Sequence, residues 1–176
     1  KTILEAFIAF REEVITRRTK FELNKARDRA HILLGLVVAV TNLDEVVKII
    51  RGSSSPPVAR AALMAREWPV AEIAQYIKLV EAIETEVEGD TYQLSEVQVR
   101  AILDLRLHRL TALGRDEIGD ELKKLAVEIE EYLAILGDRV KLFAVMREEL
   151  EAIDREFSTP RLCEIAPSWD GLDDED

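Results

Sequence analysis

Hydrophobic residues recur every three or four positions over the C-terminal part of the chain. The stripe consists of Ile118, Leu122, Leu125, Ile129, Tyr132, Leu136, Val140, Phe143, Met146, Leu150, Ile153 and Phe157. Its mean spacing of about 3.5 residues is typical of a helix that packs along another helix. The pattern predicts a returning arm helix over residues 115–158, about 60 Å long at 1.5 Å per residue. Gly137 interrupts the spacing, and because glycine weakens a helix, we expect a bend there.

The N-terminal part of the chain carries a second apolar stripe, which begins with Ile3, Phe7, Phe10 and Val14. Neither Pro nor Gly interrupts the sequence before Gly35, so we expect a first arm helix over residues 1–40. Each long helix leaves an apolar stripe that needs a partner. The two stripes together predict an antiparallel two-helix coiled-coil arm.

The register of this arm follows from where the two helices are joined. If they meet near Val40 and Arg115, opposite residues have numbers that add to about 155. Ile3 should then lie near Ala152 and Ile153. Lys25 should lie near Glu130.

The segment between the arms, residues 41–114, predicts a small globular knob. Residues 32–40 are apolar on all helix faces, which indicates a buried helix end. Five short helical pieces are expected after it: Asn42 to Gly52, Val58 to Arg66, Pro69 to Ile83, Ser95 to Leu107, and a short turn that ends at Gly114. The fold class is therefore all-α, a long two-helix arm capped by a helical knob.

Local signals within the knob mark where its helices begin. Asn42 and Glu45 have the spacing of a capping box, as do Ser95 and Gln98. The segment from Glu84 to Gln93 contains Gly-Asp and predicts a turn-rich excursion or a small hairpin.

A leucine-rich run in the knob supplies the candidate interaction site. Its residues are Leu103, Leu105, Leu107 and Leu110. One interpretation is core packing. The other is that part of the run is exposed and forms a homodimer, because a knob at the end of a long arm has much surface for its volume.

Charge limits the range of binding functions. The formal net charge is −11, which disfavours a general nucleic-acid binder, since a phosphate backbone attracts clustered cations. Residues 16–29 are nevertheless basic, with Arg17, Arg18, Lys20, Lys25, Arg27 and Arg29. These cations either form a DNA-facing strip or pair with acids on the returning helix, where Asp116, Glu117, Asp120, Glu121, Glu128, Glu130 and Glu131 lie.

The sequence contains no recognisable catalytic or metal-binding motif. We therefore predict no catalytic, cofactor-binding or metal-ligating residue. His31 and His108 lie in apolar helical contexts, and Cys163 has no basic neighbour to activate it.

A single cysteine fits a reducing cytoplasm, and the longest apolar run is too short to span a bilayer. The acidic residues 159–176 are expected to form a linker tail, and a chain that opens on Lys1 inside a helical pattern is expected to be a piece of a longer protein.

Several segments resemble the A subunit of bacterial DNA gyrase, a type IIA topoisomerase. The resemblance rests on residues 10–23, on residues 25–33 with 42–46, on residues 94–111, and on the end of the returning arm from Glu148 to Arg161. It covers residues 3–165 in order. The corresponding subunit of topoisomerase IV shares much of it, although Thr19–Leu23 and Arg109–Thr111 are closer to gyrase.

The resemblance implies a function that the periodicity alone does not. Such subunits form homodimers, pair with the ATPase subunit gyrase B, and pass one DNA duplex through a break in another to introduce negative supercoils. The duplex leaves between two arms whose knobs meet at an exit gate. The resemblance therefore implies a homodimer through the knob, with DNA passing between the arms, in the bacterial cytoplasm.

Catalysis is expected elsewhere in the longer protein. None of Tyr76, Tyr92 and Tyr132 has the family's active-site context, so this chain is expected to be non-catalytic. ATP and Mg²⁺ are expected to bind to other domains of the full enzyme. Two alternatives remain: a standalone helical scaffold, and a helical domain that contacts DNA through Arg17, Arg18 and Lys20.

Overall fold

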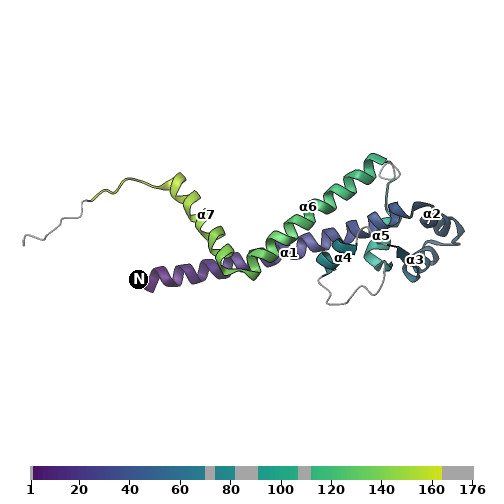
Figure 1. The fold of residues 1–176 in the computed structure, drawn as a ribbon, viewed down its shortest axis with the longest axis horizontal. Coiled ribbons are helices and arrows are strands. Elements are labelled where there is room, and N and C mark those ends of the chain that lie inside the picture. The colour runs from purple at the N-terminus through teal and green to yellow at the C-terminus, as the bar shows by residue number, and fades with distance from the viewer. Residues whose placement is uncertain (1, 70–73, 82–90, 107–111, 164–176) are drawn as a thin grey trace, which may run out of the picture.

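A computed structural model describes residues 2–69, 74–81, 91–106 and 112–163 of the chain. Within them lie seven helices and one small two-stranded sheet (Figure 1). The elements in order are α1 (Thr2–Thr41), α2 (Leu43–Gly52), α3 (Pro56–Ala65), β1 (Glu67–Pro69), α4 (Ala74–Glu81), β2 (Thr91–Gln93), α5 (Glu96–Leu103), α6 (Ala112–Gly137) and α7 (Arg139–Phe157). The predicted all-α class is confirmed.

The long helix α1 runs the length of the molecule, and α6 returns along it in the opposite direction (Figure 1). Leu23, Ala26 and Ala30 of α1 and Leu122 and Ile129 of α6 belong to one buried cluster. The three α1 residues recur at spacings of three and four, so they form one face of that helix. The predicted first arm helix over residues 1–40 matches α1 closely, and its antiparallel partner is confirmed as far as Gly137.

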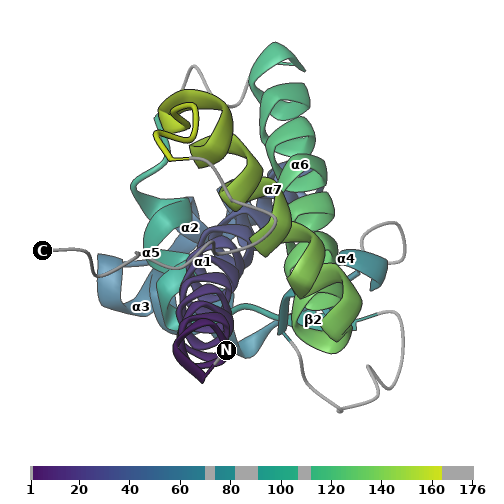
Figure 2. The ribbon, with the colours of Figure 1, turned by 90° about the vertical axis from the view of Figure 1, so that its left-hand side faces the viewer.

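The returning arm is not one helix to its end. It stops at Gly137, and α7 begins at Arg139 in a new direction, so the predicted bend is confirmed. Figures 1 and 2 show the far end of α7 well away from the N-terminal end of α1. The predicted contact of Ile3 with Ile153 is therefore wrong: these side chains are 84% and 53% exposed. The break in the apolar spacing at Gly137 indicates a bend, but it does not indicate the direction that α7 takes after it.

The core of the knob forms around the C-terminal end of α1. Leu33, Leu34 and Val38 are almost fully buried there, as the apolar run predicts. Around them pack residues from every short helix and from both strands of the knob, among them Val46, Leu63, Trp68, Ile77, Val80, Tyr92, Val99 and Ile102. Trp68 is buried, and its indole Nε1–H donates to the carbonyl of Leu63 at 3.1 Å. Its polar atom is thereby satisfied.

Pro69 does not begin a helix. It ends β1, which pairs antiparallel with β2 so that Trp68 lies opposite Tyr92. The segment Thr91–Gln93, at the end of the predicted turn-rich excursion, thus pairs with a strand more than 20 residues earlier in the chain. The rest of the excursion, Glu84–Asp90, lies outside the described residues. Four short helices of the knob lie among its described residues, and the fifth predicted piece, the short turn ending at Gly114, falls mainly on residues 107–111, outside the described part.

The two predicted capping boxes have different outcomes. At Ser95 both hydrogen bonds of the box form: its side chain accepts from the backbone N–H of Gln98, and the Gln98 side chain accepts from the backbone N–H of Ser95. Asn42 begins α2 as predicted but makes no side-chain cap. Its amide donates instead to the carbonyl of Val38 at 2.9 Å, at the end of α1. Because only one residue separates the two helices, the exposed carbonyls of α1 compete for that side chain.

Candidate functional site

The structure places two of the four predicted interface leucines. Leu103 is the last residue of α5, and Leu105 comes just after the C-cap residue Asp104. The helix therefore ends four residues before the predicted end at Leu107. Both side chains are half-buried and pack against the main core. Leu107 and Leu110 lie outside the described residues. Leu103 and Leu105 therefore contribute to the core while keeping part of their surface available.

A buried polar network fixes α5 against α1. The Gln98 side chain is fully buried; its Nε2 donates to the carbonyl of His31 at 2.7 Å and to the Tyr92 hydroxyl at 2.9 Å. A Cβ on Gly35 would lie 2.6 Å from Cβ of Gln98, so only glycine permits this close approach. The network holds the N-terminal turn of α5 in a defined position on α1, and Leu103 lies at the other end of the same helix.

Exposed apolar side chains occur on three helices of the knob. Val47 and Ile50 of α2 are each 37% exposed, Val58 of α3 is 48% exposed, and Val97 of α5 is 56% exposed. Sequence reasoning did not single out these residues. The available signal was the three-residue spacing of Val47 and Ile50 beside the buried Val46, which widens the apolar face of α2 beyond its core contact.

Part of the basic stretch of α1 pairs with acids on the returning helices. Arg29 binds Glu121 of α6 at 2.7 Å, and because their numbers add to 150 this pair lies about five residues from the predicted register. Arg18, together with Arg11, binds Glu149 of α7. The other ion pairs of this stretch are local, since Lys25 pairs with Glu22 of its own helix at 3.8 Å and not with Glu130. Ion pairing thus accounts for several of these cations without DNA.

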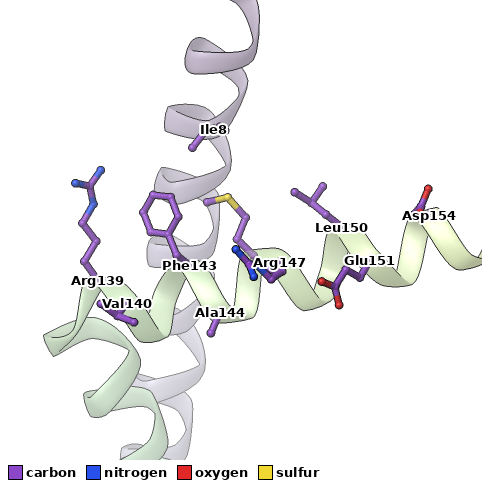
Figure 3. A pocket seen from close by; sticks show the side chains of 10 residues that line it. Ile8, Arg139, Val140, Phe143, Ala144, Arg147, Leu150, Glu151 and Asp154 are labelled. Atoms are coloured by element: carbon purple, nitrogen blue, oxygen red, sulfur yellow. The ribbon is translucent and has the colours of Figure 1, made fainter.

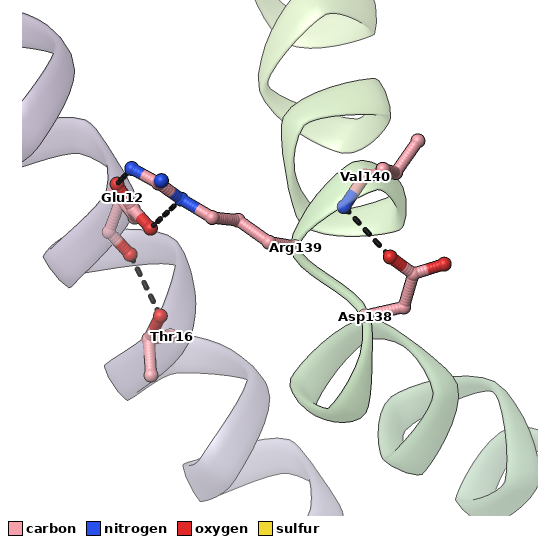
Figure 4. A network of polar contacts seen from close by, with 5 residues as sticks. All are labelled: Glu12, Thr16, Asp138, Arg139 and Val140. Carbon is pink, nitrogen blue, oxygen red and sulfur yellow. Dashed lines mark hydrogen bonds and ion pairs between the residues drawn. The ribbon is translucent and has the colours of Figure 1, made fainter.

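A second polar network marks the junction of α6 and α7 (Figure 4). Asp138 is extended, and its carboxylate accepts from the backbone N–H of Val140 at 2.8 Å, which caps α7. The guanidinium of Arg139 donates two hydrogen bonds to Glu12 of α1, at 2.9 and 3.0 Å. These bonds, with the charge of Arg139, lower the pKa of the Glu12 carboxyl from its usual 4.5, while partial desolvation opposes them.

An open groove of about 970 Å³ lies between α7 and the N-terminal half of α1 (Figure 3). Its lining is largely apolar, with Ile8 on the α1 side and Val140, Phe143, Met146 and Leu150 on α7. Just beyond the groove, Ile15 of α1 is fully buried against Leu142 and Met146. Figure 3 shows α7 crossing α1 here rather than running along it.

The remaining reactive side chains have structural surroundings where they are described. His31 contacts the Ser95 hydroxyl through Nε2 at 2.8 Å, while His108 lies outside the described residues. The pKa of Tyr132 is raised, mainly because burial disfavours its charged form. The negative charges of Glu128, Glu22 and Glu131 raise it further. Cys163 is exposed. Across residues 2–69, 74–81, 91–106 and 112–163, no cluster of three or more His, Cys, Asp or Glu side chains could hold a metal ion.

A membrane-spanning helix is likewise not found in the part of the chain that the structure describes.

Comparison with known proteins decides the family. The family model for the A subunit of DNA gyrase and topoisomerase IV matches residues 1–151. The chain belongs to this family. It is 49% identical over 176 residues to the DNA gyrase A subunit of Granulibacter bethesdensis, covering 99% of this chain and 19% of that protein.

Other relatives give the same assignment. The DNA gyrase A subunit of Rickettsia felis is 49% identical over 165 residues, covering 94% of this chain and 18% of that protein. The Haemophilus influenzae gyrase A subunit is 43% identical over 184 residues, covering all of this chain and 21% of the relative. The resemblance to gyrase A subunits is confirmed. The chain spans about a fifth of the length of the curated relatives that it matches.

Proposed function

We propose that this chain is one arm and one knob of the exit gate of DNA gyrase, a type IIA topoisomerase that introduces negative supercoils by passing one duplex through another. The knob meets the knob of a second copy, and the two arms enclose the space through which the transported duplex leaves. The chain itself is non-catalytic. The observation that carries this proposal is the set of exposed apolar side chains on a rigid helical knob held at the end of a long α1–α6 pair.

The architecture supports a gate that must both hold and open. The α1–α6 pair is long, and its inner face is closed by a continuous core that includes Leu122, Ile129 and Leu23. Such a pair resists bending and transmits a force to the knob. The knob surface is only moderately apolar, with Val47 and Ile50 each about one third exposed. A contact of this kind can form and separate reversibly, unlike the large apolar interfaces of obligate dimers.

Membership of the family supports a proposal for the remaining partners. In the full enzyme the gyrase A protein works with the ATPase subunit, gyrase B, and ATP and Mg²⁺ are used by domains outside this chain. The setting is the bacterial cytoplasm. The same region of the topoisomerase IV homologue is the nearest alternative, because the matching family model includes both enzymes.

Sedimentation of the purified chain tests the knob dimer. We expect a species of about twice the 20.0 kDa mass of one chain. The double change Val47→Glu and Ile50→Glu should give monomers with unchanged helix content, since two buried carboxylates oppose association. Val127→Glu is the matched control, because Val127 is 55% exposed but lies on α6 of the arm. A parent chain that stays monomeric at all concentrations contradicts the proposal.

A further inference from the structure

The cations of α1 lie on two faces of that helix. The first face carries cations that pair with acids, and these recur at spacings of seven and four residues: Arg11, Arg18, Lys25 and Arg29. Their partners are Glu149 of α7, Glu22 of α1 and Glu121 of α6. The charge of this face is therefore offset within the chain.

The second face has no such partners on the returning helices. Its residues are spaced by three and four, and we call them the open basic strip: Arg17, Lys20, Asn24 and Arg27. At 3.6 residues per turn, the middle of the strip lies roughly 145° around the helix from the first face. Among the described residues Lys20 and Arg27 make no ion pair. Arg17 pairs with Glu13 of its own helix at 3.7 Å, where the two side chains are 76% and 67% exposed, so the pair contributes little.

The open basic strip is accessible over most of its length. Arg17, Lys20 and Asn24 are exposed, and Arg27 is half-buried. The Nε atom of Arg27 makes no hydrogen bond, so the protein leaves the bonding of this guanidinium incomplete. From Arg17 to Arg27 the strip spans about 15 Å at 1.5 Å per residue. One strand of a DNA duplex presents a phosphate about every 3.4 Å along the axis, so the strip can lie beside about four phosphates.

We propose that Arg17, Lys20 and Arg27 contact the phosphate backbone of the transported duplex as it passes the arm. The inference rests on the proposed function, which has a duplex leave between two arms, and it assigns the contact to one face of α1. Arg18, which the sequence pattern also offered to DNA, is excluded because it binds Glu149. Phosphate contacts position a duplex without reading its bases, which suits an enzyme that passes DNA of any sequence.

The acidic remainder of the chain keeps this contact weak. The formal net charge is −11, but exposed charges farther apart than about 8 Å are largely screened at physiological salt. The local strip therefore decides whether a phosphate is attracted. Three cations make a contact that forms and breaks easily, so the strip guides the duplex along the arm without delaying its release.

The salt dependence of DNA binding by the purified chain tests the strip. The fluorescence anisotropy of a short labelled duplex measures the affinity at about 50 and 200 mM salt. Three phosphate contacts predict that the affinity of the parent chain falls about 40-fold between these concentrations. The double change Arg17→Gln and Lys20→Gln should leave one contact and a fall of about 3.5-fold. Asn24→Lys should add a contact and increase the fall to about 150-fold.

Matched changes on α6 control for net charge. Lys123→Gln with Lys124→Gln removes the same two charges from exposed residues of that helix, and Val127→Lys adds one charge. Both should keep the 40-fold fall of the parent chain, and circular dichroism should show the same helix content in every variant. The inference is overturned if the parent chain does not bind DNA at the lower salt concentration, or if the α6 changes alter the salt dependence as much as the α1 changes.

Sedimentation of the same samples distinguishes this inference from the gate proposal. Arg17→Gln and Lys20→Gln lie on the arm, so the double variant should dimerise like the parent chain. Dimers without strip-dependent DNA binding overturn the inference and leave the gate proposal standing. A parent chain that binds DNA through the strip but stays monomeric contradicts the gate proposal alone.

Discussion

The guanidinium of Arg139 contacts the carboxylate of Glu12 through two parallel hydrogen bonds, of 2.9 and 3.0 Å. The contact joins the first residue of α7 to the middle of the N-terminal half of α1, across 127 positions of sequence. Arg139 also lies over the ring of Phe143, 5.1 Å from its centroid. A bidentate pair fixes the direction of the arginine as well as its distance. The Arg139–Glu12 pair thus holds the junction of α6 and α7 against α1, at the place where the returning arm is interrupted.

This anchor predicts a specific pH dependence. The pKa of Glu12 is lowered in the folded state, so its contribution to stability is present above the unfolded value near 4.5 and is lost as the pH falls through the lowered folded value. Glu12→Gln should therefore flatten the loss of stability on acidification. Urea unfolding followed by circular dichroism between about pH 5 and 3 measures the slope. Glu5→Gln, at an exposed residue with no ion-pair partner among the described residues, should leave the slope unchanged.

The close approach of α5 to α1 predicts that Gly35 tolerates no larger residue. In Gly35→Ala the new Cβ would meet Cβ and Cγ of Gln98 at 2.6 and 2.7 Å, so we expect a loss of about 1–3 kcal/mol in the free energy of unfolding. Gly119→Ala is the matched control. Gly119 lies on α6, and a Cβ added there would meet nothing within 4 Å. The higher helix propensity of alanine than of glycine should stabilise the chain by about 0.5–1 kcal/mol. Equal effects of the two changes would contradict this account of the packing.

The buried Gln98 network predicts a cost for removing its polar atoms even when the volume is kept. Gln98→Met leaves the hydrogen-bonding groups of Ser95 and Tyr92 without that partner in a buried setting. We expect about 2 kcal/mol of destabilisation. Thermal and urea unfolding measure the loss. Gln75→Met, at an exposed residue of α4, provides the comparison and should change stability little.

The leucine-rich run gives a separate prediction about association. Leu105→Glu should weaken dimers, but because Leu105 packs against the main core, the same change should also lower the melting temperature. Leu107→Glu, the second substitution in this run, is expected to give monomers. Sedimentation and melting curves on the same samples distinguish a lost interface from a disturbed core. Dimers that persist in both variants would move the interface away from this run.

The sequence by itself determined the elements that depend on local pattern. Neither Pro nor Gly interrupts residues 1–34, and this stretch together with the apolar run after it forms the one helix α1, although the side chains of Ile3, Phe7 and Phe10 stay exposed. The capping box of Ser95 and Gln98 could also be predicted from the sequence, since both residues lie within one helical turn. The bend at Gly137 could be expected from the break in spacing, although its direction could not. The family assignment also rested on sequence alone.

Tertiary structure decided what depends on residues far apart in the chain. Pro69 joined a strand because Thr91–Gln93 offers backbone partners there, which no local signal at Pro69 reveals. Asn42 capped the helix before it instead of the one after it, because both helix ends compete for one short side chain. The direction of α7 depends on the Asp138 backbone and on where Glu12, Arg11 and Arg18 of α1 meet its charges. Periodicity states which side chains need a partner, and only the packed chain determines whether that partner is within reach.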